Sequence, residues 1–121
     1  MDKIILKDIL VRGILGINPE ERTTKQDIRL NITLLTDIRR AAESRNIEDT
    51  VNYFTITERL IEFVENSSYL LLETLVSEVA KLLLRENPLV VKVIVRVEKP
   101  TALRYTNAVG IEIERSREDF A

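Results

Sequence analysis

Residues 91–100 read VKVIVRVEKP, and the alternation in this stretch decides the fold class. Valine occupies every odd position from 91 to 97, whereas three of the four even positions from 92 to 98 are charged. A period of two predicts a strand that buries one face and leaves the other at the surface. Ile94 lies among the charged residues on the exposed face of this predicted strand.

Three further segments have the composition of strands. Apolar residues occupy the even positions from 28 to 34 and the odd positions from 109 to 113, and residues 4–17 are rich in Ile, Leu and Val. We therefore expect four strands, of which the last two are antiparallel neighbours. The polar stretch from Asn18 to Gln26 begins with a turn signal and predicts a hairpin-like connection between the first two strands.

Two segments between the second and third strands have the apolar spacing of helices. Residues 56–64 form the first, and a longer helix is predicted from about Leu71 to Arg85. It ends at Asn87-Pro88, because proline disfavours the helical conformation of the residue before it. The charged residues 37–50 have no sustained apolar period and predict an irregular or briefly helical crossover.

The order strand, strand, helix, helix, strand, strand (ββααββ) predicts an α+β fold. We expect a four-stranded antiparallel sheet with both helices on one face. The chain of 121 residues has room for one domain, which we assign to residues 1–121. Such a sheet leaves two edges and one uncovered face, which natural proteins protect by pairing or closure, so we also expect oligomerisation.

Composition excludes several classes of function. The 18 basic and 20 acidic residues nearly balance, so nucleic acid is not an expected partner. The absence of Cys and His removes thiol nucleophiles, Ser-His-Asp triads and the usual zinc sites, and no loop has the acidic spacing of an EF-hand. No apolar run is long enough for a membrane span and the first residues do not resemble a signal peptide, so we expect a cytoplasmic protein.

Five places in the chain could contribute chemical groups, although each also has a simple structural explanation. Glu20 and Glu21 could be solvated loop carboxylates, and residues 49–53 could cap a helix with a partly buried aromatic ring. Glu73 near the start of the second helix could only complement the helix dipole. Lys99 could be a solvated residue at a strand end, and polar and aromatic residues such as Arg104 and Tyr105 are common in hairpin connections.

Together, however, these segments resemble the dihydroneopterin aldolase family. The resemblance lies in DTVNY at 49–53, LLETL at 71–75, VRVEKP at 95–100 and VGIEI at 109–113, and it extends over essentially the whole chain. It implies the tunnelling fold, in which four subunits pair their sheets into a barrel. It also implies two such rings stacked into an octamer, active sites at subunit interfaces, a pterin substrate, and neither metal nor organic cofactor.

Two segments separate the subgroups of this family. Residues 13–17 (GILGI) and 99–109 (KPTALRYTNAV) resemble the dihydroneopterin triphosphate 2′-epimerases more closely than the aldolases. Leu15 occupies a position where an aldolase usually has histidine, which favours the epimerase. Thr101 occupies a position where either subgroup usually has histidine.

The resemblance also implies roles for particular residues. Glu73 anchors the pterin by accepting its amino group and ring N–H, a donor pair that suits one carboxylate. Lys99 is the main acid/base group, Glu21 positions or relays a proton through water, and Tyr53 of a neighbouring subunit handles the last proton. A separate hypothesis, which rests on Arg104 alone, is that its planar guanidinium binds the triphosphate. The remaining substrate-binding positions are Val51, Leu71 and Leu72.

Three functions therefore follow as hypotheses. The first is epimerisation at C2′ of the dihydroneopterin triphosphate side chain by bond cleavage and re-addition. The second is aldol cleavage of dihydroneopterin, with release of glycolaldehyde and 6-hydroxymethyl-7,8-dihydropterin in folate biosynthesis. The third, from a different class, is a non-catalytic ring-forming protein that has kept the pterin-binding fold.

Overall fold

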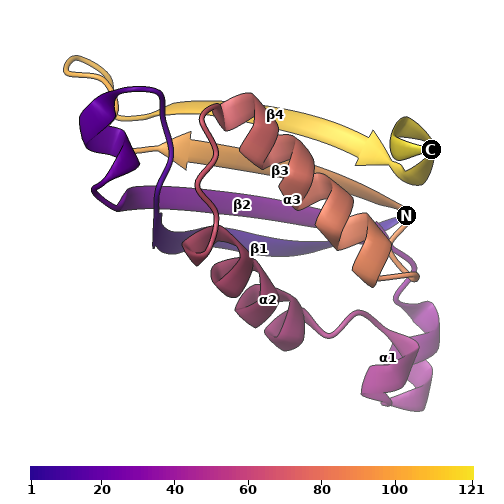
Figure 1. The fold of residues 1–121 in the computed structure, drawn as a ribbon. Coiled ribbons are helices and arrows are strands. Elements are labelled where there is room, and N and C mark those ends of the chain that lie inside the picture. Colours follow the sequence, from indigo (N-terminus) through magenta and orange to yellow (C-terminus); the bar gives the residue numbers. More distant parts are fainter.

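The computed structural model describes residues 1–121. Its four strands form one antiparallel sheet in the order β1-β2-β3-β4 (Figure 1). Its strands are β1 (Asp2–Gly13), β2 (Gln26–Thr36), β3 (Lys92–Lys99) and β4 (Val109–Ser116). The helices α1 (Arg39–Ser44), α2 (Tyr53–Glu65) and α3 (Leu72–Glu86) follow β2 and precede β3 in the chain. The α+β class and the ββααββ order are confirmed, and α1 is the brief helix expected in the crossover.

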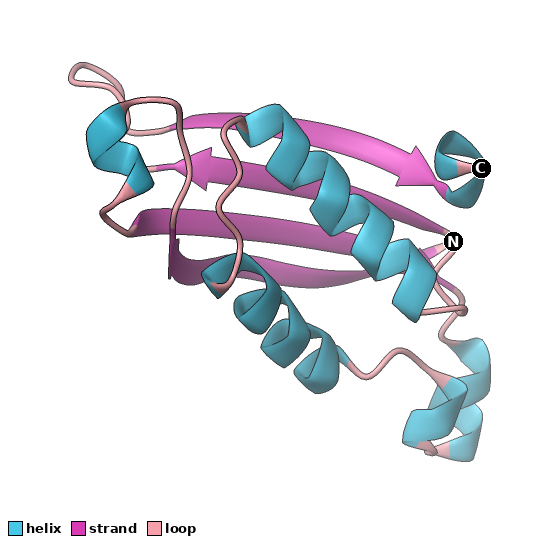
Figure 2. Cartoon of the chain, viewed as in Figure 1, coloured by secondary structure: helices cyan, strands magenta, loops and turns pink.

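Both long helices lie on the same side of the sheet (Figure 2). Val93, Val95 and Val97 of β3 are completely buried, as the alternation predicts. Leu60 of α2 and Val79 of α3 are also completely buried and belong to the same core cluster. None of the helices has the length and apolarity needed to cross a lipid bilayer.

A bulge in β1 changes which positions of this strand face the core. The register with β2 shifts between Leu6 and Ile9, and Asp8 at the bulge adopts a left-handed conformation with φ of 56°. The Asp8 backbone N donates to Asn31 Oδ1 at 2.9 Å. Even-numbered residues pack inward before the bulge and odd-numbered residues after it, which explains why residues 4–17 are apolar without a single period of two.

Helix α2 begins three residues earlier than the apolar spacing predicts. Asn52 is its N-cap, and Asn52 Oδ1 accepts hydrogen bonds from the backbone N of Phe54 at 3.1 Å and of Thr55 at 3.3 Å. This cap satisfies N–H groups that the first helical turn leaves unpaired. Tyr53 therefore becomes the first residue of the helix, where its ring is 56% exposed rather than partly buried.

The face of the sheet opposite the helices is polar and open. Cross-strand ion pairs lie along it, namely Arg12–Asp27, Arg29–Glu98, Arg96–Glu112 and Lys92–Glu114. Strands β1 and β4 are the edges of the sheet, and no other strand of the chain pairs with their outer sides. Oligomerisation through these edges stays a prediction.

The packing of α2 on the sheet leads to a stability prediction. Leu60→Ala should lower the free energy of unfolding by about 2–5 kcal/mol, because Leu60 is completely buried and its truncation leaves a cavity. Urea unfolding followed by circular dichroism measures the change. Leu89→Ala is the matched control. Because Leu89 is 48% exposed, its truncation should lower the free energy of unfolding much less. Equal losses would contradict the described core.

Candidate active site

Glu21 is held by the short 3₁₀ turn η1 (Pro19–Arg22), which the sequence did not predict inside the polar connection. Two reciprocal hydrogen bonds form this turn. The Glu21 backbone N donates to Asn18 O at 2.9 Å, and the Asn18 backbone N donates to Glu21 Oε1 at 3.2 Å. Pro19 suits the first position of the turn, because it has no N–H to leave unpaired. The Glu21 carboxylate is therefore positioned locally by its own turn.

Lys99, the last residue of β3, completes an ion pair with this carboxylate. Lys99 Nζ donates to Glu21 Oε2 at 2.7 Å, and the exposed fractions of the two side chains are only 13% and 18%. Gln26 Nε2 donates to the same oxygen at 3.3 Å. The hydrogen bond from Lys99 outweighs the effect of burial and lowers the pKa of Glu21 below its usual value of 4.5. Near neutral pH, the Glu21 carboxylate is therefore ionised and accepts a hydrogen bond from Lys99.

Gly16 leaves the space that the Glu21 carboxylate occupies. Its φ of +133° lies in a region that other L residues rarely adopt, and an added Cβ would overlap the carboxyl group of Glu21. Glycine is thus required at position 16 for two reasons: the backbone conformation disfavours other residues, and the Glu21 carboxyl group occupies the space where a Cβ would lie. In the sequence, this glycine is marked only by its place in the subgroup segment GILGI at 13–17.

A cavity of about 500 Å³ lies beside the ion pair. It is lined by Glu21 and Lys99 together with Leu71, Leu72 and Glu73. Five of the eight predicted site residues thus meet in one cavity. Helix α3 begins at Leu72 without a side-chain cap, so N–H groups of its first turn remain available to a ligand next to Glu73. The cavity combines a charged pair, a second carboxylate and apolar walls.

Three predicted site residues do not line this cavity within one chain. Tyr53 begins α2, and the 13 residues of that helix, about 20 Å long, separate it from the α2–α3 connection that leads to the cavity (Figure 1). Val51, just before α2, is 4% exposed and packs in the core. Arg104 is exposed in the β3–β4 connection, where its guanidinium lies 5.3 Å from the centre of the Tyr105 ring.

Sequence reasoning missed two polar residues at the site. Gln26 donates to the Leu15 carbonyl at 2.6 Å as well as to Glu21, which joins the start of β2 to the start of the connection after β1. Arg22 donates to backbone carbonyls of both the Gly16 loop and the α2–α3 connection. The sequence carried no signal for these contacts, since they join segments that only the fold brings together.

The two positions that distinguish the subgroups have different surroundings. Leu15 is completely buried and belongs to the hydrophobic core. Thr101 lines a polar hollow of about 330 Å³ that also includes Glu21 and Lys25. Thr101 therefore shares a hollow with Glu21, whereas the Leu15 side chain packs in the core.

The four-stranded antiparallel sheet with both long helices on one face has the architecture of a tunnelling-fold subunit, and the Lys99–Glu21 ion pair lies beside its cavity. More particularly, the FolB family model, described as dihydroneopterin aldolase, matches residues 4–114, and the chain belongs to that family. The resemblance inferred from the sequence motifs is thus confirmed.

Known relatives and structures carry both enzyme names. The dihydroneopterin triphosphate 2′-epimerase of Pseudomonas aeruginosa is 39% identical over 117 residues, which cover 97% of this chain and 94% of that protein. Folic acid synthesis protein FOL1 of Dictyostelium discoideum is 36% identical over 120 residues, but the chain spans only 18% of that protein. The structure of Escherichia coli dihydroneopterin aldolase in complex with neopterin has a TM-score of 0.92 and 31% identity, covering 96% of this chain and 100% of that one.

The ion pair leads to a pH-dependent stability prediction. Glu21→Gln should lower the free energy of unfolding near pH 7 by about 1.5–3 kcal/mol, since a hydrogen bond to a charged group contributes that much. The lowered pKa means that native Glu21 binds fewer protons than unfolded Glu21. Its contribution is therefore complete above the unfolded value of 4.5 and is lost as pH falls through the native value.

Urea unfolding at about pH 7 and in steps down to about pH 3 measures this effect. Glu20→Gln is the matched control, because the neighbouring Glu20 carboxylate has no hydrogen bond or ion pair within the chain. A loss for Glu21→Gln no larger than the control, at every pH, would show that the pair does not stabilise the fold.

Proposed function

We propose that the chain catalyses epimerisation at C2′ of the 7,8-dihydroneopterin triphosphate side chain. The observation that carries this proposal is the meeting of the Lys99–Glu21 pair with Glu73 in one cavity. Identity of 39% with the Pseudomonas aeruginosa epimerase over nearly the full length of both chains supports the epimerase over other reactions.

In this proposal, the pterin ring is bound through its hydrogen-bonding edge. The Glu73 carboxylate accepts the amino group and the ring N–H, and backbone N–H groups at the start of α3 donate to the ring carbonyl. Leu71 and Leu72 provide apolar contact with the ring, and the low polarity around them strengthens the charged hydrogen bonds. Because the Val51 side chain is buried in its own chain, we propose that Val51 contributes through its backbone.

The reaction begins with removal of the 2′-hydroxyl proton by a base. The bond between C1′ and C2′ then breaks, its electron pair moves into the pterin ring, and C2′ leaves as the carbon of an aldehyde. Re-addition to the other face of that aldehyde re-forms the bond, and return of the proton to oxygen gives the 2′-epimer. Every atom and electron pair is recovered, so no external oxidant or reductant is needed.

The ion pair suits this sequence of proton transfers. The Glu21 carboxylate is an acceptor near neutral pH, and a water bound to it can pass on the proton. The Lys99 ammonium donates to Glu21 and is close enough to stabilise the negative oxygen that forms. In this proposal the two side chains therefore act as a unit and exchange a proton with the substrate as a pair.

The second candidate function is aldol cleavage of dihydroneopterin. The E. coli aldolase, whose structure was determined with neopterin, is 31% identical and covers the same fold. Its reaction shares the first two steps, after which protonation of C1′ and release of glycolaldehyde replace re-addition. The same Lys99–Glu21 pair serves both outcomes, so the fate of the aldehyde distinguishes them.

We further propose that Tyr53 reaches the cavity of a neighbouring subunit. Its ring is 56% exposed at the end of α2 remote from its own cavity, and the edges β1 and β4 are free to pair with other copies. An octamer of two stacked tetrameric rings would bring such sites together at its interfaces. The cytoplasmic location and the independence from metals and organic cofactors stay predictions of the sequence.

Product analysis tests the proposed function. We expect wild-type protein incubated with dihydroneopterin triphosphate to give the 2′-epimer as the main product in chromatography. Lys99→Ala should lose at least about 100-fold in kcat, as expected for removal of an acid/base group. Lys81→Ala is the matched control, because this α3 lysine pairs with Glu78 and lies over the Phe120 ring, away from the residues that line the cavity. Glycolaldehyde and hydroxymethyl-dihydropterin as dominant products would favour the aldolase, and no product from either substrate would favour the non-catalytic alternative.

Arg104 gives a test of substrate charge. Arg104→Ala should reduce kcat/KM for the triphosphate about 10-fold and leave that for dihydroneopterin unchanged, because only the triphosphate offers an anion to the guanidinium. Steady-state kinetics with both substrates measure the ratio. Arg85→Ala, which removes an exposed arginine from α3, is the control. An unchanged preference for the triphosphate would remove Arg104 from the proposal.

A further inference from the structure

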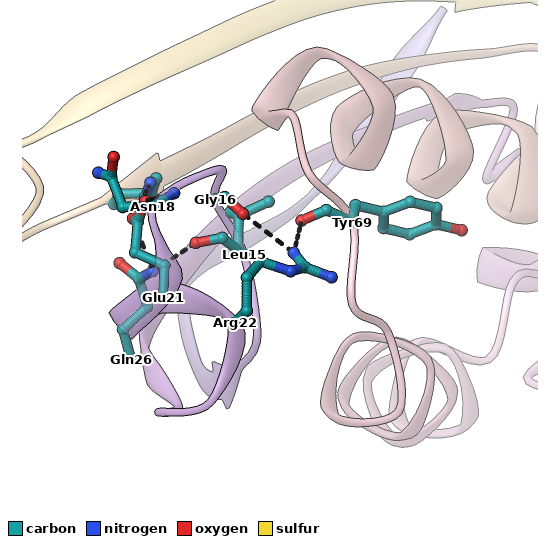
Figure 3. A network of polar contacts seen from close by, with 8 residues as sticks. Leu15, Gly16, Asn18, Glu21, Arg22, Gln26 and Tyr69 are labelled. Carbon is teal, nitrogen blue, oxygen red and sulfur yellow. Dashed lines mark hydrogen bonds and ion pairs between the residues drawn. The ribbon is translucent and has the colours of Figure 1, made fainter.

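Arg22 joins the two sides of the cavity through backbone carbonyls. Its Nη1 donates to Gly16 O at 3.0 Å and to Tyr69 O at 3.1 Å, and its Nη2 donates to Ser68 O. Figure 3 shows the guanidinium lying between the Gly16 loop and the backbone of Tyr69. One side chain therefore bonds both segments. Arg22 is 46 residues from Ser68 and 47 residues from Tyr69 in the sequence.

These two segments carry different parts of the site. Arg22 directly follows Glu21 in η1, and the Glu21 carboxylate lies over Gly16, so one segment positions Glu21, the partner of Lys99 from β3. Ser68 and Tyr69 belong to the α2–α3 connection, which leads directly into Leu71 and Glu73. The Gly16 backbone N also donates to Tyr69 O at 3.2 Å, which closes the network.

We propose that Arg22 is a positioning residue that fixes the separation between the Glu21–Lys99 pair and the pterin anchor Glu73. The inference rests on the proposed function for its catalytic consequence, whereas the coupling of the two segments rests on contacts alone. Arginine suits this role because its planar group presents several N–H donors in a fixed geometry, and lysine cannot reproduce that fork.

The local geometry separates this role from general stabilisation of η1. That turn is already closed by the hydrogen bonds between Asn18 and Glu21, and Glu21 is held from its other side by Lys99 and Gln26. Loss of Arg22 therefore leaves both halves of the site formed. What it removes is most of the hydrogen bonding between them, leaving the single bond from Gly16 to Tyr69.

A change in separation should affect the chemical step more than binding. The pterin ring contacts mainly the segment with Glu73, so its affinity depends little on the position of the other segment. Proton removal depends on the distance from the pair to the 2′-hydroxyl, and a misplacement of about 1 Å can cost about 100-fold in rate. The positioning role of Arg22 thus predicts that kcat falls while the Kd for the pterin stays nearly constant.

The experiment compares Arg22→Ala and Arg22→Lys with the wild-type full chain. We expect kcat for dihydroneopterin triphosphate to fall about 10- to 100-fold in Arg22→Ala and by an intermediate factor in Arg22→Lys, while the Kd for neopterin changes less than about threefold. Hydrogen exchange should become faster in both residues 14–18 and 66–70. Arg39→Ala, which removes an exposed arginine paired with Asp37, should alter none of these.

Three results would overturn the inference: an unchanged kcat in Arg22→Ala, a Kd for neopterin that rises in step with the loss of kcat, or faster exchange confined to residues 14–18. The Lys variant keeps the charge and tests the same points should the Ala variant fail to fold. If wild-type protein turns over neither substrate, the proposed function fails. In that case, hydrogen exchange and neopterin binding still decide whether Arg22 couples the two segments.

Discussion

The ion pair between Lys99 and Glu21 is the interaction on which the functional part of the structure depends. Its partners are 78 residues apart in the sequence, at 2.7 Å in the fold. Lys99 is placed by the pairing of β3 between β2 and β4, and Glu21 by the turn that leads into β2. Because both side chains are mostly buried, neither charge could remain there alone without a large desolvation cost. The pair is therefore both a constraint on the connection between β1 and β2 and the chemical group beside the cavity.

Three further residues of the site hold the surroundings of this pair in place. Gly16 leaves room for the carboxylate, Gln26 supplies a second donor to it, and Arg22 links its loop to the segment that carries the second carboxylate, Glu73. A single chain thus brings the Lys99–Glu21 ion pair, the proposed acid/base group, and Glu73, the proposed pterin anchor, together in one cavity. Tyr53 lies at the far end of α2, so its proposed role in proton transfer needs a second chain to bring the phenol to the cavity.

Much of the fold could be predicted from the sequence, because alternation in β3 and helical spacing in α3 are local properties of burial. Family motifs similarly indicated that Glu21, Glu73 and Lys99 share a site. Three features could not be predicted. The bulge at Asp8 combines two alternation phases in one strand, the turn η1 is formed by hydrogen bonds within a polar loop, and the contacts of Arg22 join distant backbone carbonyls. None of these leaves a periodic pattern. The role of Tyr53 came from family resemblance and that of Arg104 from the chemistry of the residue alone, and their positions outside the cavity of one chain explain why geometry does not assign them.

The central claim is that a complete site combines Lys99 of one chain with Tyr53 of another. Subunit complementation tests it most directly: Lys99→Ala and Tyr53→Phe chains are purified separately, then unfolded, mixed in equal amounts and refolded together. The account predicts that each variant alone has little epimerase activity and that the mixture recovers up to about a quarter of the wild-type value, since random assembly gives that share of sites both native residues. A mixture no more active than the two separate variants, or a Tyr53→Phe protein with wild-type activity, would contradict the account.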